Sequence, residues 1–129
     1  MLLLISPPAA LCQNIAAVNL EWTVDHTTDL RTDASASFSC TFITNGTEGV
    51  TWLQKNGEIS TAFSVTGTEG TWTNVASQGT FTYQLTRDGK SGFMTVEKNG
   101  EGTFITLDFS ESGAFAIKRR FRIASVTEP

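Results

Sequence analysis

Few side chains in this sequence of 129 residues have the type and spacing that catalysis needs. The single histidine, His26, lies beside Asp25 and close to Asp29, and a general base with a carboxylate partner has this composition. However, no matching nucleophile is near it in the sequence, and a histidine among acidic residues is more commonly a solvated side chain. The chain also lacks a G-x-S-x-G elbow and a Gly-rich phosphate loop. We therefore expect a protein that is not an enzyme.

Metal and cofactor signatures are equally sparse. Cys12 and Cys40 are the only cysteines, and with one histidine they do not form a zinc-ligand spacing. Asp25, Asp29 and Asp33 are spaced by four residues, but they lack the glycine and the bidentate glutamate of a calcium loop. The sequence predicts neither a bound metal nor a cofactor.

Binding is the chemistry that the aromatic residues favour. The strands that contain Phe93 and Phe104 carry apolar groups on both faces, so a second layer covers them or they form a binding surface. Arg119 interrupts an apolar strand face and needs an aromatic ring or a carboxylate as partner, with Trp22 or Glu21 as candidates. The predicted ligand-binding residues are Trp22, Trp72, Phe93, Phe104 and Arg119.

Short strands joined by tight turns must position these residues. Apolar and polar residues alternate with a period of two, and helical periodicity is nearly absent. Four dipeptides accept the positive φ of hairpin turns: Asn45-Gly46, Asn56-Gly57, Asp88-Gly89 and Asn99-Gly100. Strands are expected near residues 17–25, 36–43, 50–54, 62–66, 71–75, 79–86, 92–97, 102–109 and 114–125. The fold class is therefore all-β, an antiparallel meander of about eight strands.

Two resemblances bear on how this meander closes. Cys40 and Trp52, with eleven residues between them, resemble the B and C strands of an immunoglobulin-like domain, which implies a two-sheet sandwich. Trp22, paired with Arg119 or Arg122, is similar to the early Trp and late Arg of lipocalin-like barrels. That resemblance implies a closed barrel that holds a small apolar ligand. Sequence reasoning leaves sandwich and barrel as alternatives.

The N-terminal segment indicates export. An apolar run at residues 2–5 is followed by Ala10-Leu11-Cys12, which resembles the end of a bacterial secretory signal. We interpret residues 1–12 as a truncated signal and residues 13–129 as a single all-β domain that begins at Gln13 once the signal is cut. The apolar run is far shorter than the ~20 residues of a membrane-spanning helix. The expected location is secreted, periplasmic or extracellular.

Removal of this segment would leave Cys40 without an internal disulfide partner. Cys40 shares one strand face with Phe38 and Phe42. The pattern predicts a small, buried and unreactive thiol.

The charge distribution limits the class of partner. A formal net charge of -4 argues against a nucleic-acid binder, although residues 118–129 contain four basic side chains and one acidic side chain. We expect a secreted, non-enzymatic binding domain for a small apolar ligand, a glycan or a protein partner. The alternative is a structural or assembly subunit of an extracellular surface that self-associates through its edge strands.

Overall fold

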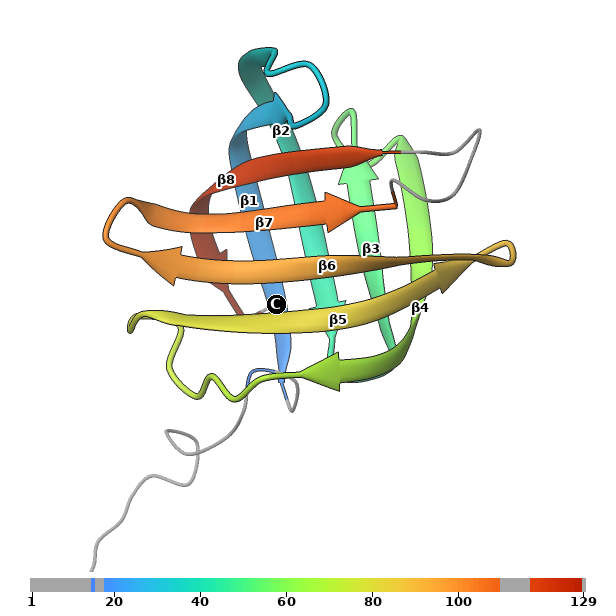
Figure 1. The fold of residues 1–129 in the computed structure, drawn as a ribbon, viewed down its shortest axis with the longest axis vertical. Coiled ribbons are helices and arrows are strands. Elements are labelled where there is room, and N and C mark those ends of the chain that lie inside the picture. Colours follow the sequence, from blue (N-terminus) through green and yellow to red (C-terminus); the bar gives the residue numbers. More distant parts are fainter. Residues whose placement is uncertain (1–14, 16–17, 110–116, 129) are drawn as a thin grey trace, which may run out of the picture.

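The computed structural model describes residue 15, residues 18–109 and residues 117–128. Eight antiparallel strands follow one another around a closed barrel (Figure 1). They are β1 (Asn19–Asp29), β2 (Ser35–Asn45), β3 (Gly49–Gln54), β4 (Ile59–Glu69), β5 (Gly79–Arg87), β6 (Lys90–Asn99), β7 (Gly102–Asp108) and β8 (Lys118–Thr127). The predicted signal segment, residues 1–12, and the expected cut before Gln13 lie outside the described residues.

Pairing of the first and last strands closes the barrel. Trp22 of β1 lies opposite Val126 of β8, and Thr27 lies opposite Phe121. Every other strand pairs with its neighbours in the sequence, so the ladder runs from β1 to β8 and back to β1. The predicted all-β meander and its barrel option are confirmed, and the sandwich alternative is wrong. Closure pairs both sides of each strand without splitting the sheet into two layers.

The four Asn-Gly and Asp-Gly dipeptides all fall at hairpin turns, as predicted, but neither Asn99 nor Gly100 has the expected positive φ. Asp88 and Gly89, between β5 and β6, have φ values of 53° and 78°. Two successive positive φ values are the requirement of a type I′ turn, whose twist matches that of the strands it joins.

One expected strand is absent. Residues 71–75 lie in the connection between β4 and β5, while β4 extends to Glu69. The prediction was wrong because alternating threonines carry a high β-propensity that tertiary packing overrides here. The packing in question is that of Trp72, which is only 3% exposed.

Alternate residues of each strand fill the barrel with aromatic and aliphatic side chains. Phe42 stacks on Trp52 with 5.5 Å between ring centroids, and Phe121 meets both rings edge-on at 5.1 Å and 5.6 Å. Cys40 is buried on the same inner face, as predicted, and burial raises the pKa of its thiol to about 11. An eight-stranded barrel is just wide enough for such side chains to fill it.

Candidate functional site

An apolar pocket lies at the end of the barrel where β1 begins and β8 ends. Its volume is about 220 Å³. Three segments line it: the chain before and at the start of β1, the β4–β5 connection, and the end of β8. The lining residues are Ile15, Val18, Leu20, Thr73, Asn74, Val75, Val126, Thr127 and Glu128. We call this site the mouth pocket.

Five of the nine described lining residues of the mouth pocket are aliphatic, and the other four are polar: Thr73, Asn74, Thr127 and Glu128. Leu20 and Ile15 belong to the buried core, and Val75 and Val126 pack against it. Glu128 contributes a carboxylate, and none of the described lining residues is basic. Apolar walls with a few polar groups are typical of small-molecule sites, and barrel mouths are common places for them. The carboxylate disfavours an anionic ligand at this site.

Trp72 closes the barrel beside the mouth pocket. Its ring lies 6.3 Å from that of Trp22, centroid to centroid. The Trp72 indole N–H donates to the Ser77 carbonyl at 3.1 Å, and the Ile15 N–H donates to the Trp72 carbonyl at 2.8 Å. The structure therefore brings two predicted binding residues together, but as a buried plug and not as exposed ligand contacts.

Replacing Gly79 by alanine should displace this plug. A Cβ at Gly79 would lie 2.2 Å from Cδ1 of Trp72, so the indole must move. We expect a loss of about 1–3 kcal/mol in the free energy of unfolding and a red-shifted tryptophan emission. The Trp72→Ala background provides the control, because Gly79→Ala should cost far less once the ring is gone. Equal costs in the two backgrounds would contradict this packing.

Two buried polar groups in the barrel interior have no hydrogen-bond partner among the described residues: the Trp52 indole N–H and the Tyr83 hydroxyl. In contrast, the Trp22 indole N–H donates to the Thr44 hydroxyl at 3.1 Å. Burial raises the pKa of Tyr83 to about 12. The polar side chain of Thr44 favours the phenolate and lowers the pKa, but this effect is smaller than that of burial. The interior therefore disfavours charge on Tyr83.

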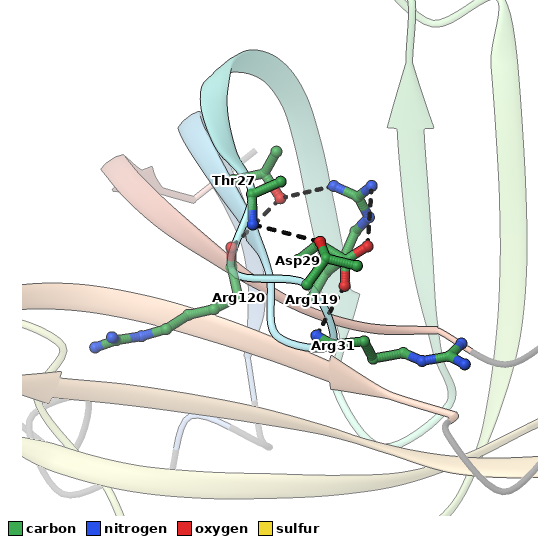
Figure 2. A network of polar contacts seen from close by, with 7 residues as sticks. Thr27, Asp29, Arg31, Arg119 and Arg120 are labelled. Atoms are coloured by element: carbon green, nitrogen blue, oxygen red, sulfur yellow. Dashed lines mark hydrogen bonds and ion pairs between the residues drawn. The ribbon is translucent and has the colours of Figure 1, made fainter.

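Arg119 lies at the opposite end of the barrel, where β1 ends and β8 begins. Figure 2 shows it in a network of polar contacts with Thr27 and Asp29. Its Nη2 lies 3.8 Å from Oδ2 of Asp29, and its Nη1 donates to the Thr27 hydroxyl at 3.4 Å. The expectation of a carboxylate partner is confirmed, but the named candidates, Trp22 and Glu21, are wrong. Antiparallel pairing places Arg119 opposite Asp29, at the end of β1. Trp22 lies near the other end of the same strand, opposite Val126, and is therefore out of reach of Arg119.

The outer face of β7, β8 and β1 carries a second group of polar and aromatic residues. The Arg120 guanidinium carbon lies 3.7 Å from the centroid of the Phe104 ring. Arg122 makes two hydrogen bonds to the Asp25 carboxylate, at 3.0 Å and 3.2 Å, and this contact holds the pKa of Asp25 below its usual value. His26 lies on β1 directly opposite Arg122.

The two phenylalanines proposed for binding do not form one surface. Phe93 is 50% exposed, whereas Arg120 lies over the Phe104 ring. Phe104 lies opposite Glu97 of β6, and Glu97 is four residues along that strand from Phe93. Phe93 and Phe104 are therefore roughly 13 Å apart along the strand direction. Sequence reasoning missed the mouth pocket, since its residues come from three segments that only the closed barrel brings together.

Among the described residues, no cluster of His, Cys, Asp and Glu side chains is suited to hold a metal ion. No helix in that part of the chain has the length and apolar character needed to cross a membrane. Comparisons with protein-family models, with curated proteins and with solved structures find no match to the chain.

Proposed function

We propose that this protein is an exported binding domain that holds a small apolar ligand in the mouth pocket. The observation that carries the proposal is the 220 Å³ pocket, with five aliphatic lining residues, beside the plugged end of the barrel. Export rests on the signal-like residues 1–12 of the sequence. The pocket's geometry and chemistry also narrow the class of ligand.

The ligand should be neutral or cationic and small. The interior beyond the plug is filled by aromatic side chains such as Trp22, Phe42 and Phe81, each at most 1% exposed. A long chain therefore has no room to enter without displacing Trp72. Glu128 would repel a carboxylate, and no described lining residue offers a positive charge to compensate.

The alternative, an assembly subunit, loses the feature that motivated it. Self-association through edge strands needs a strand with one unpaired side. Each of the eight described strands pairs with two neighbours in the closed ring. The binding function therefore has the stronger support.

Filling the mouth pocket should weaken ligand binding. Val75 lines the pocket from the β4–β5 connection, so Val75→Trp places an indole in the ligand volume. With the neutral dye N-phenyl-1-naphthylamine, we expect saturable binding to the natural protein. The dissociation constant should rise at least roughly tenfold in Val75→Trp, because apolar contact area is lost.

Ala76→Trp is the matched control, since Ala76 is exposed and does not line the pocket. It adds the same ring one residue away and should leave dye affinity unchanged. Laurate, which carries a carboxylate, should bind more weakly than the dye. Equal affinity in the two variants, or no saturable binding to the natural protein, would refute the mouth pocket as the site.

A further inference from the structure

A groove on the outer face of the barrel is separate from the mouth pocket. Its volume is about 290 Å³, and its lining residues are His26, Thr28, Glu101, Phe104, Arg120 and Arg122. We call it the outer groove. Strand register explains why these residues meet: Phe104 of β7 lies opposite Arg122 of β8, which lies opposite His26 of β1. Arg120 lies in the next outward row, opposite Thr28, and successive rows are about 7 Å apart.

Arg120 is the cation of this groove that is left for a ligand. Among the described residues, no carboxylate forms an ion pair with it, whereas Arg119 faces Asp29 and Arg122 faces Asp25. The Phe104 ring, 3.7 Å below, holds the guanidinium against the sheet. A guanidinium positioned in this way keeps its N–H groups free to donate to a carboxylate in a fixed plane.

The charges of the outer groove favour a monoanion over a dianion. The Arg122–Asp25 pair is neutral overall, which leaves one positive charge on Arg120 and one negative charge on Glu101 in the outer groove. A phosphate dianion would bring a second negative charge toward Glu101 without a second free cation to meet it. A single carboxylate carries one negative charge, which the one positive charge of Arg120 is enough to neutralise.

The other groups of the outer groove suit hydroxyl groups. The Glu101 carboxylate accepts hydrogen bonds, and the His26 imidazole donates and accepts. The Thr28 hydroxyl already shares one hydrogen bond with the Ser35 hydroxyl at 2.9 Å and keeps a lone pair that can accept from a ligand. We propose that the outer groove binds a sugar acid, with the carboxylate on Arg120 and ring hydroxyls on Thr28, His26 and Glu101. The shared chemistry is a uronate, either free or as a unit of an acidic glycan.

Glucuronate titration followed by NMR chemical shifts tests the proposal. We expect saturable shifts at millimolar glucuronate, no binding of neutral glucose, and weaker binding of inorganic phosphate. Arg120→Ala should weaken glucuronate binding at least roughly tenfold, because a charge-assisted hydrogen-bond pair is lost. Arg87→Ala is the matched control: it makes the same change of charge at the β5–β6 turn, next to its partner Asp88, and should leave affinity unchanged.

Polygalacturonate separates the two sources of the ligand. Tighter binding of the polymer than of the monomer, per uronate unit, assigns the groove to an acidic glycan, and equal or weaker binding assigns it to a free sugar acid. No glucuronate binding, an equal loss in Arg87→Ala and Arg120→Ala, or phosphate binding as tight as that of glucuronate would overturn the proposal. The dye experiment on the mouth pocket is independent, since the two sites have no lining residue in common.

Discussion

Gly92→Ala is expected to lower the free energy of unfolding by about 3 kcal/mol, or to prevent folding. Gly92 lies on β6 and is buried, with its inner face covered by the ring of Phe109. A Cβ here would lie 2.5 Å from Cγ of Phe109 and 2.6 Å from the carbonyl oxygen of Asp108. The oxygen belongs to the backbone and cannot move by a change of rotamer. The effect should therefore exceed that of Gly79→Ala, where only the Trp72 side chain is in the way.

Gly100→Ala provides the matched control for Gly92→Ala. No described atom lies within 4 Å of a Cβ at Gly100 in the β6–β7 turn. We expect a change within about 0.5 kcal/mol, as for most surface substitutions. Urea unfolding of the two variants makes the comparison. Similar losses of stability in the two variants would show that replacing a glycine is itself costly and that the clash at Gly92 adds little.

The protein should lose stability steeply in alkali. Burial raises the pKa of Cys40 from 9.0 to about 11 and that of Tyr83 from 10.0 to about 12. The unfolded chain releases these protons at lower pH than the folded chain, so stability is complete below pH 9 and falls as pH rises through 9–12. Each group should account for a loss on the order of 2–3 kcal/mol by pH 12. Denaturant unfolding at a series of pH values measures this profile.

Single substitutions assign the two parts of the alkaline transition. Cys40→Ala should flatten the profile between pH 9 and 11, and Tyr83→Phe should flatten it between pH 10 and 12. Tyr83 is the only tyrosine, so absorbance of the phenolate reports its pKa directly. A phenol that titrates near 10.0 in the folded protein would contradict its burial.

The local rules of the sequence determined the strand content and the turns. Alternation in segments such as β5, with Phe81, Tyr83 and Leu85 pointing inward, depends only on the pleat of a strand. The Asp88-Gly89 turn depends only on which residues accept positive φ. Burial of Cys40 followed from the same alternation. These features depend on residues that are close together in the chain, so they can be predicted from the sequence alone.

Only the tertiary structure decided how the sheet closes and what its closure brings together. Barrel and sandwich share the same alternation, and the difference lies in the register between β1 and β8, whose paired residues are about 100 positions apart in the chain. That register gives Arg119 its Asp29 partner and aligns Phe104, Arg122 and His26 across the outer groove. Trp72 leaves the sheet because burying an indole against Trp22 outweighs the β-propensity of the threonines beside it. The mouth pocket likewise exists only where three distant segments meet, which no local pattern encodes.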